Sequence, residues 1–337
     1  MSTHQTPIGS GFSATSTAEQ VIEGHDLTGR VVIVTGGYAG LGLETVRVLS
    51  KAGATIIAPA RDIPKAEKAL AGIDGVEIEA MDLIDPASID AFTERFLASG
   101  RPLHLLVNSA GIMAPPLTRD ARGFESQFAT NHLGHFQLTA RLWPALVAAN
   151  GARVVALTSL GHRYSPVVFE DWNYEHREYQ KWAGYGQSKT ANSLFAVGLD
   201  KRGKSHGVRA FAVHPGGILT DLTRYLSREE LLAGGAIDEE GRPTARMKTL
   251  EQGAATTVWC AVSSSLDGMG GVYCENCDVA PIFPEDPSLP ADTTMSANSA
   301  QSFGVRNWAV NPEFAERLWT LSEELTGVSF DLTAPAV

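Results

Sequence analysis

The chain has 337 residues, and its 27 Lys and Arg against 38 Asp and Glu give a formal net charge of −11 with His neutral. Apolar residues make up 44% and charged residues 19%, a globular composition that excludes a collagen-like, disulfide-scaffolded or wholly disordered chain. The acidic balance argues against nucleic acid as a partner and against adhesion to anionic membranes.

The three cysteines, Cys260, Cys274 and Cys277, are too few for a disulfide framework and predict a reducing compartment. The first twenty residues contain no Lys or Arg and no apolar stretch, so no signal peptide is expected. The longest apolar runs, such as 31–34 and 103–107, fall short of the roughly 18 residues of a membrane-spanning helix. We therefore expect a cytoplasmic protein without a membrane segment.

Residues 1–26 are predicted to form an N-terminal arm, mobile to about Ala14, with Ser16 and Glu19 as a capping box for a short helix. Strands and helices then alternate along the chain. Apolar and β-branched runs predict strands at 30–35, 55–58, 76–80, 103–107, 153–157 and 208–213. Helical periodicity predicts helices at 41–52, 64–70, 86–98, 124–149 and 185–201.

This alternation predicts βαβ units and a parallel sheet, and strands that are apolar on both faces indicate helices on both sides. The sequence therefore predicts one α/β domain over 27–278, with no linker or repeat that would divide it. A C-terminal extension follows over 279–337. Its Pro-, Asp- and Ser-rich part, 278–300, predicts a loop or strap, and 312–325 predicts a terminal helix.

A glycine-rich turn, TGGYAGLG at 35–42, follows the first strand and opens the first long helix. Glycines let the chain turn tightly and approach a pyrophosphate, and the helix N-terminus offers free N–H groups and a positive dipole end. Glycines in a turn can also serve packing alone. The strand–turn–helix context favours a nucleotide site.

The spacing T-G-x-x-x-G-x-G resembles the classical short-chain dehydrogenase/reductase family, and the resemblance runs from about Leu27 to Asp278. Further matching motifs follow in order: Asp82-Leu83, the N-S-A-G turn at 108–111, His214-Pro215-Gly216 and Thr220. The resemblance implies a doubly wound Rossmann domain that binds its dinucleotide through Gly36, Tyr38, Gly40, Leu41, Gly42, Asp82, Leu83, Asn108, Ala110, Gly111, Tyr185, Lys189, Pro215, Gly216, Ile218 and Thr220.

The choice of cofactor is read at the end of the second strand, where an acidic residue would bind the ribose hydroxyl of NAD. This chain has Ala60 followed by Arg61, and a guanidinium can pair with a 2′-phosphate. The pattern predicts NADP(H), with NAD(H) as the second choice. In the alternative reading Arg61 is an exposed charge, and Asp62 lies next to it.

Tyr185 and Lys189 are spaced i, i+4 and share one helix face, with the helix predicted to start at the tyrosine. A nearby ammonium lowers the pKa of a phenol, so the pair is expected to give Tyr185 a lowered pKa. Ser159 at the end of the fifth strand and Asn131 match the family's remaining catalytic positions. The resemblance implies that Tyr185 transfers a proton, Ser159 orients the substrate oxygen, Lys189 tunes the tyrosine and binds ribose, and Asn131 completes a proton relay.

Two other groupings are weighed as metal sites and set aside. Cys274 and Cys277 form a C-x-x-C, but a structural zinc site needs about four ligands and only Cys260 remains, so buried thiols are expected. His132 and His135 lie within a motif, N-H-L-G-H-F, that matches the family's helix, and packing or hydrogen bonding is expected of them. No metal is predicted.

Segments 131–136 and 185–195 look most like the retinol dehydrogenase and WW-domain oxidoreductase branch. An insert at 165–182, rich in aromatic residues, is expected either to wall an apolar substrate pocket or to cover the sheet end or form an interface, and both readings stay open. A charged substrate loop is expected at 219–247. We predict an NADP(H)-dependent enzyme acting on an alcohol, ketone or aldehyde, as a homodimer or homotetramer. A C=C reductase and a non-catalytic NADP(H) sensor or interaction protein are the alternatives.

Overall fold

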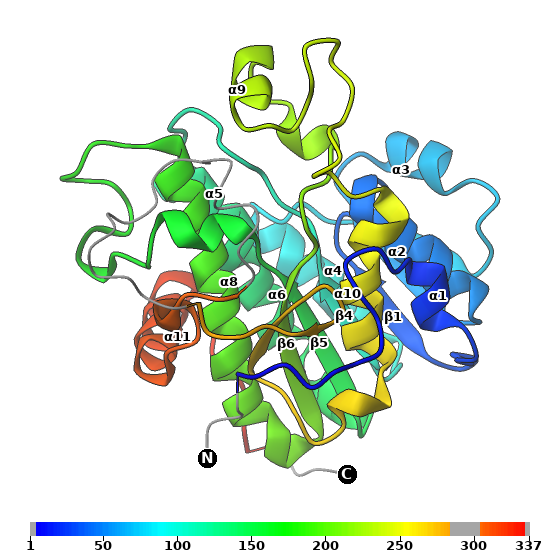
Figure 1. The fold of residues 1–337 in the computed structure, drawn as a ribbon. Coiled ribbons are helices and arrows are strands. Elements are labelled where there is room, and N and C mark those ends of the chain that lie inside the picture. Colours follow the sequence, from blue (N-terminus) through cyan, green and yellow to red (C-terminus); the bar gives the residue numbers. More distant parts are fainter. Residues whose placement is uncertain (1–4, 284–303, 334–337) are drawn as a thin grey trace.

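The computed structural model describes residues 5–283 and 304–333. Within these residues an eight-stranded sheet has the order β3-β2-β1-β4-β5-β6-β7-β8 (Figure 1). Strands β1 to β7 are parallel, and β8 pairs antiparallel with β7. The predicted doubly wound α/β fold is confirmed. The strands are β1 (Val31–Val34), β2 (Thr55–Ala60), β3 (Val76–Ala80), β4 (Leu105–Asn108), β5 (Ala152–Leu157), β6 (Val208–His214), β7 (Val272–Glu275) and β8 (Asp278–Val279).

Helices cover both faces of the sheet because alternate residues of each central strand point to opposite sides. Val32 and Val34 pack with α1, α2, α3 and α10, whereas Ile33 packs with α4, α6, α7 and α8. The helices are α1 (Ala18–Ile22), α2 (Gly40–Lys51), α3 (Ile63–Leu70), α4 (Pro86–Ala98), α5 (Ser126–Phe128), α6 (Gly134–Arg141), α7 (Trp143–Ala148), α8 (Lys181–Gly203), α9 (Arg228–Ala233), α10 (Leu250–Val262) and α11 (Pro312–Thr326). Among the described residues no helix is both long enough and apolar enough to span a membrane.

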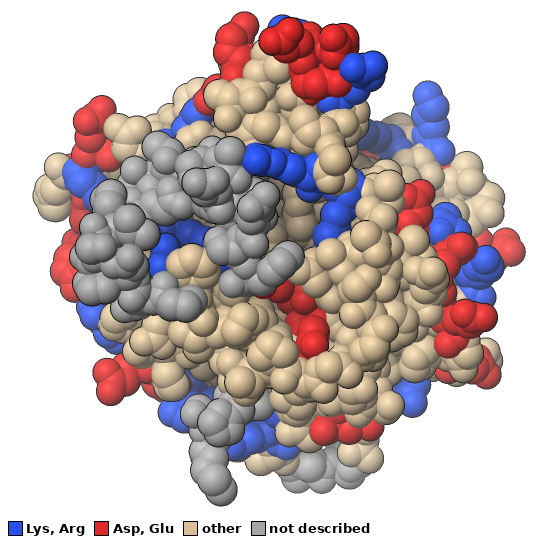
Figure 2. All heavy atoms as spheres, viewed as in Figure 1, with Lys and Arg blue, Asp and Glu red and all other residues tan. Residues whose placement is uncertain are grey.

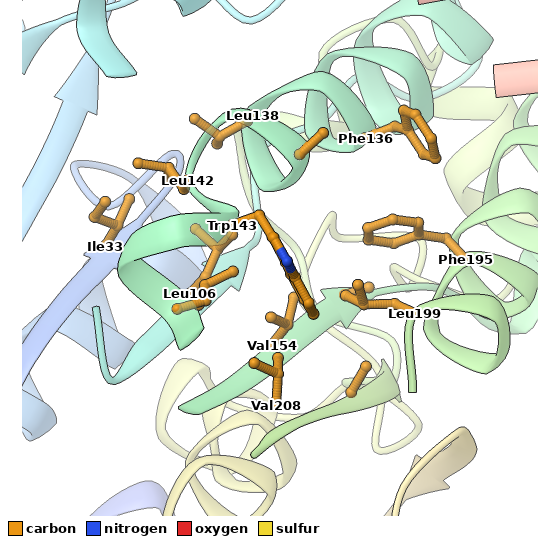
Figure 3. Close-up of a cluster of buried hydrophobic side chains, with 14 of the residues drawn as sticks. Ile33, Leu106, Phe136, Leu138, Leu142, Trp143, Val154, Phe195, Leu199 and Val208 are labelled. Atoms are coloured by element: carbon orange, nitrogen blue, oxygen red, sulfur yellow. The ribbon is translucent and has the colours of Figure 1, made fainter. Parts of the chain in front are cut away.

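Trp143 lies in the hydrophobic core on the face of the sheet that α4, α6, α7 and α8 cover. Figure 3 shows its indole among Leu106 and Val154 from the sheet, Leu199 from α8 and Val208 from β6. The indole N–H donates to the carbonyl of Asp331, 2.9 Å away, which satisfies the polar end of a fully buried ring.

The single helix predicted at 124–149 is wrong, because the segment is broken into four pieces. A π-helical turn, η1 (Ala129–Leu133), separates α5 from α6, and α7 begins after a bend at Leu142. Pro144 lies in the first turn of α7 and has no N–H to continue α6. The π-helical turn contains Asn131, and such turns are frequent at functional sites.

From Gln5 onward the N-terminal arm is more ordered than the sequence predicts. Gln5 clamps the backbone of Tyr273 in β7, donating at 2.7 Å and accepting at 2.9 Å. Asp278 accepts hydrogen bonds from the backbone of Ile8 and Gly9. The expected mobile arm is therefore wrong from Gln5 onward. The capping box of α1 is built by Thr17 and Gln20 rather than by Ser16 and Glu19.

The C-terminal region also differs from its predicted outline. Strands β7 and β8 were not predicted, and they are joined by a two-residue turn at Asn276 and Cys277 with φ of 53° and 59°. Most of the loop predicted at 278–300 lies outside the described residues. Helix α11 matches its prediction and packs on α8 beside Phe136 and Phe195, where its Trp319 stacks 6.1 Å from the ring of Phe195.

Candidate active site

The predicted site residues follow the carboxyl ends of the parallel strands, so they meet along one edge of the sheet. The glycine turn follows β1, Asn108 ends β4, Ser159 follows β5 and His214 ends β6. The strand order reverses between β1 and β4, and a crevice at such a point is where ligands bind in open parallel sheets.

The turn after β1 has the shape required by a phosphate cradle. A Cβ on Gly42 would lie 2.3 Å from the carbonyl oxygen of Gly36, so only glycine fits there. Helix α2 begins after Ala39, which offers no side chain to cap the first N–H groups. Seven other helices, α1, α3, α4, α5, α9, α10 and α11, are capped by Thr17, Asp62, Asp85, Glu125, Ser227, Thr249 and Asn311.

The glycine turn and the absence of a side-chain cap on α2 fit a dinucleotide, because the partly positive N–H groups at the start of α2 would attract the negative charge of a pyrophosphate. The pyrophosphate would be held by Gly36, Gly40, Leu41 and Gly42. Tyr38 is half-buried against the core on the α2 side of the sheet.

Thr35 joins the cradle to the turn after β4. Its hydroxyl accepts from the backbone N–H groups of Ser109 and Ala110 at 2.9 and 3.0 Å. It also lies 2.9 Å from Nε2 of His135. The side-chain oxygen of Asn108 is buried and has no hydrogen-bond partner among the described residues.

The predicted adenosine end of the site lies at β2 and β3. Ala60 is the last residue of β2, and Arg61 is exposed with no ion-pair partner within residues 5–283 and 304–333. Asp62 caps α3 by accepting from the backbone N–H of Lys65 at 3.1 Å. The acidic neighbour of Arg61 is therefore committed to its own helix.

The residues after β3 close the same end. Asp82 accepts from the N–H of Ile84 at 3.3 Å, and Leu83 is buried. A Cβ on Gly134 would lie 2.2 Å from the carbonyl oxygen of Leu83, so the start of α6 passes directly over this segment.

The turn after β6 borders the crevice from the other side. Gly216 has a φ of 103°, a conformation that suits glycine. The side chain of Thr220 lies against Gly40 at the start of α2. Pro215, Ile218 and Thr220 thus follow the strand end in the predicted order, with Ile218 packed on Gly253 of α10.

The structure brings the four predicted catalytic residues together. Ser159 and Tyr185 approach each other at Gly161, where a Cβ would lie 3.4 Å from Oγ of Ser159 and 2.7 Å from the Tyr185 ring, and Nζ of Lys189 lies 5.6 Å from the centroid of that ring. Lys189 also donates to the carbonyl of Leu157 at 3.1 Å. Asn131 accepts from the N–H of Ile112 at 2.9 Å and donates to its carbonyl at 3.0 Å, so its amide is fixed.

The position of Gly111 connects the cofactor turn to the catalytic groups. A Cβ on Gly111 would lie 3.0 Å from the side-chain oxygen of Asn131 and 3.7 Å from Nζ of Lys189. The predicted catalytic and cofactor-binding residues therefore border one space.

The expectation that Tyr185 has a lowered pKa is wrong. Burial raises the pKa of Tyr185 to about 12, and the hydrogen bond with Ser159 lowers it only in part. Burial also lowers the pKa of Lys189 to about 8, because an ammonium is costly away from water. Burial is the main cause of both shifts, so Tyr185 is a neutral phenol near neutral pH.

Sequence reasoning missed two residues of the catalytic centre. Gly161 makes room for the catalytic ring, since a Cβ there would lie 2.7 Å from Cε1 of Tyr185. Ser188 accepts from the amide of Asn131 at 2.9 Å and donates to the carbonyl of Tyr185 at 2.8 Å. Ser188 lies three residues after Tyr185, a spacing that could have identified it. Helix α8 starts at Lys181, so Tyr185 lies in its second turn rather than at its start.

The aromatic insert divides between the two readings given to it. Trp182 lies beside the catalytic ring, with centroids 6.2 Å apart, and contacts Tyr164 at 5.8 Å. Trp172 instead packs against Phe124 and Phe128, each at 5.2 Å, in a cluster beneath α11.

Two further aromatic residues of the insert are structural. Phe169 faces Phe314 of α11, with ring centroids 6.1 Å apart. Tyr179 accepts from the amide of Gln127 at 2.8 Å and donates to the carbonyl of Pro115 at 3.2 Å. Only the Trp182 end of the insert therefore borders the catalytic residues.

The cysteines and histidines of the two groupings weighed as metal sites are buried, as expected for thiols and rings that pack or form hydrogen bonds. The three cysteines are buried free thiols, and the described residues contain no group of three His, Cys, Asp or Glu placed to hold a metal. His132 lies 2.8 Å from the hydroxyl of Ser322 in α11, and His135 bonds Thr35 and the carbonyl of Asn131.

The predicted substrate loop, 219–247, carries most of its acidic residues outward, whereas Glu230 and Asp238 are half-buried. Glu229, Glu239 and Glu240 are exposed, and Figure 2 shows Asp and Glu side chains gathered on the lobe that contains α9. A solvated outer face was the prediction for these charges.

The fold and the site define a dinucleotide-dependent oxidoreductase. Comparison with known proteins agrees: residues 30–231 match the family model described as short chain dehydrogenase. A protein of Streptomyces lividans named "Probable oxidoreductase" is 43% identical over 302 residues, 87% of this chain and 96% of its own. Retinol dehydrogenase 12 of Mus musculus is 36% identical over 311 residues, 90% of this chain and 89% of its own.

A solved structure of an uncharacterised protein from Mycobacterium paratuberculosis superimposes with a TM-score of 0.69 at 31% identity, over 92% of this chain and 98% of that one. The chain belongs to the short-chain dehydrogenase family, and it is similar to the retinol dehydrogenases of that family. The family implies an NAD(P) cofactor.

Proposed function

We propose that this protein transfers a hydride between NADP(H) and the carbon of an alcohol or carbonyl group on an apolar substrate, as a cytoplasmic homodimer or homotetramer. One observation carries the proposal. The side chains of Ser159 and Tyr185 meet at Gly161 and the ammonium of Lys189 lies beside the Tyr185 ring, at the same sheet edge as the uncapped start of α2.

Each residue of the site has a role that follows from its surroundings. The dinucleotide supplies the hydride, which joins the carbonyl carbon in the direction of reduction. Tyr185 gives its proton to the oxygen, and its raised pKa keeps it in the protonated form that can donate. Ser159 orients that oxygen. Lys189 places a positive charge beside the phenolate that forms. Asn131, whose amide is bonded to the backbone of Ile112, lies between the catalytic side chains and the turn at Gly111.

The choice of NADP(H) is supported by the surroundings of Arg61. Its guanidinium is exposed and unpaired among the described residues, while Asp62 is turned into the N-terminus of α3. Ala60 is neutral and small. A cation is thus available for a 2′-phosphate with no carboxylate competing for it.

An apolar substrate is supported by Trp182, whose ring lies next to that of the catalytic tyrosine, and by Tyr164, whose ring packs against Trp182. Relatives at 35% to 36% identity are named retinol dehydrogenases. Those names favour a bulky apolar alcohol or its aldehyde as the class to test first.

The test is NADPH oxidation with aldehydes, ketones and enones graded by size, using the wild type, Tyr185→Phe and Tyr174→Phe. Tyr174 is buried with a hydroxyl that has no hydrogen-bond partner among the described residues, and it serves as the matched control. We expect Tyr185→Phe to lower kcat by ~10²–10⁴-fold, as for loss of a general acid. NADPH affinity, followed by fluorescence, should hold in both variants. Near-wild-type turnover in Tyr185→Phe would overturn the mechanism, and reduction of enones alone would favour a C=C reductase.

A further inference from the structure

The loop after the catalytic serine meets a segment from the far end of the chain. This loop, η2 (Leu160–Tyr164), follows Ser159 directly. Residues 304–309, which end in the short helix η8 (Asn307–Ala309), pack against it. We call residues 304–309 the C-terminal strap. The strap lies outside residues 30–231, which match the family model.

His162 is the residue that joins the strap to the serine. Its Nδ1 lies 2.8 Å from the carbonyl oxygen of Ser159, and a carbonyl oxygen only accepts, so Nδ1 carries the proton. In a neutral ring Nε2 is then an acceptor, and it receives the backbone N–H of Arg306 at 3.0 Å. The ring is fully buried, and burial lowers the pKa of His162 to about 3, so it is neutral in ordinary buffers.

Further contacts hold the strap and the loop together. The carbonyl of His162 accepts from the indole N–H of Trp308 at 3.3 Å and from the hydroxyl of Thr190, next to Lys189, at 3.0 Å. Arg163 donates to the carbonyl of Gly304 at 2.8 Å. The strap is thereby tied to the residues on both sides of the site.

A second histidine fixes the other side of the same loop. Nδ1 of His214 accepts from the N–H of Leu160 at 3.2 Å, so this ring uses Nδ1 in the opposite role. Gly161, between these two anchors, donates its N–H to Oγ of Ser159 at 3.0 Å. Because Gly161 also borders the Tyr185 ring, a displacement of the loop would change the distance between the two catalytic hydroxyls.

We propose that His162 is a positioning residue for Ser159, and that the C-terminal strap is part of the active site because its Arg306 N–H holds His162 in place. Neither His162 nor the strap contacts the reacting atoms. The proposal rests on the proposed function, since its effect is read as carbonyl reduction.

The first test compares His162→Gln with His162→Phe. Glutamine supplies one N–H donor and one oxygen acceptor, so it can replace both bonds of the ring, whereas phenylalanine keeps the shape and loses both. We expect His162→Phe to lower kcat by about tenfold or more. A loss of that size corresponds to the free energy of about one hydrogen bond that aligns Ser159. NADPH affinity should remain within about twofold by this local mechanism. His162→Gln should restore most of kcat.

A matched pair of tryptophan variants provides the control. Trp308→Phe removes an indole bond to the carbonyl of His162, and Trp143→Phe removes an indole bond to the carbonyl of Asp331, far from the serine loop. Both variants loosen the end of the chain, but only Trp308→Phe should lower kcat. Thermal unfolding of all four variants separates lost folding from lost alignment.

The outcomes separate the two proposals. A wild-type protein that reduces no carbonyl refutes the proposed function and with it this inference. An active wild type whose kcat is unchanged in His162→Phe, or lowered equally in His162→Phe and His162→Gln, refutes the positioning role alone. If His162→Phe does not fold, equal kcat in Trp308→Phe and Trp143→Phe refutes it.

Discussion

Three fully buried histidines make the stability of this protein depend on pH in a calculable way. Burial lowers the pKa of His132 to about 3, of His135 to about 4 and of His162 to about 3. In the unfolded chain each returns to about 6.5. As the pH falls below about 6.5, these histidines therefore become protonated in the unfolded state but stay neutral in the folded state, and the free energy of unfolding decreases.

The magnitude follows from the shifts. Each histidine costs about 1.4 kcal/mol per pH unit between about pH 6.5 and its folded pKa, or about 2 kcal/mol at pH 5. The three together cost about 6 kcal/mol at that pH. Burial raises the pKa of Glu125 and Glu275, and these carboxyls act in the opposite direction because the folded state binds their protons first. A single variant isolates one histidine from this background.

His132→Gln is the variant of choice. The hydroxyl of Ser322 donates to the carbonyl of Leu318 at 2.7 Å, so it accepts from Nε2–H of His132, and a glutamine amide can make the same donation. In the variant the unfolded state no longer binds the extra proton at position 132. Between pH 6.5 and pH 5 its free energy of unfolding should therefore fall by about 2 kcal/mol less than that of the wild type. Urea unfolding at a series of pH values measures this difference.

His25→Gln provides the matched control, because it makes the same substitution at an exposed position. The comparison of slopes is insensitive to any constant cost of burying glutamine. If His132→Gln and wild type show equal slopes from pH 6.5 to 5, His132 is not held neutral by the folded state and the reasoning fails.

Three further outcomes follow from the site. Ala60→Asp combined with Arg61→Ala should reverse a preference for NADPH of roughly ten- to hundredfold, measured as kcat/KM for both cofactors; a wild type that prefers NADH makes Arg61 a bystander. Trp182→Ala should raise KM selectively for bulky carbonyls, whereas Trp172→Ala should leave KM unchanged and lower stability by about 3 kcal/mol in urea unfolding; the reverse pattern contradicts the division of the insert. Gly161→Ala should lower kcat, because its Cβ would lie 2.7 Å from the catalytic ring, and unchanged kcat would show that the ring moves freely.

The sequence by itself determined the elements that depend on local chemistry. The β-branched runs predicted β1 to β6, the glycine spacing predicted the turn after β1, and the order of Asn131, Ser159, Tyr185 and Lys189 predicted one catalytic centre. Parallel strands place their carboxyl ends at one edge, so motifs that follow those strands must meet there. Backbone preference and topology together left few alternatives.

Tertiary structure alone decided the properties that depend on what surrounds a group. Tyr185 has a raised rather than a lowered pKa because its side chain is buried, and burial cannot be predicted from the spacing of two residues. Helical periodicity at 124–149 did not reveal the π-helical turn that carries Asn131. The strap reaches His162 from 144 positions along the chain, a contact fixed by the packing of the whole fold and by no local pattern.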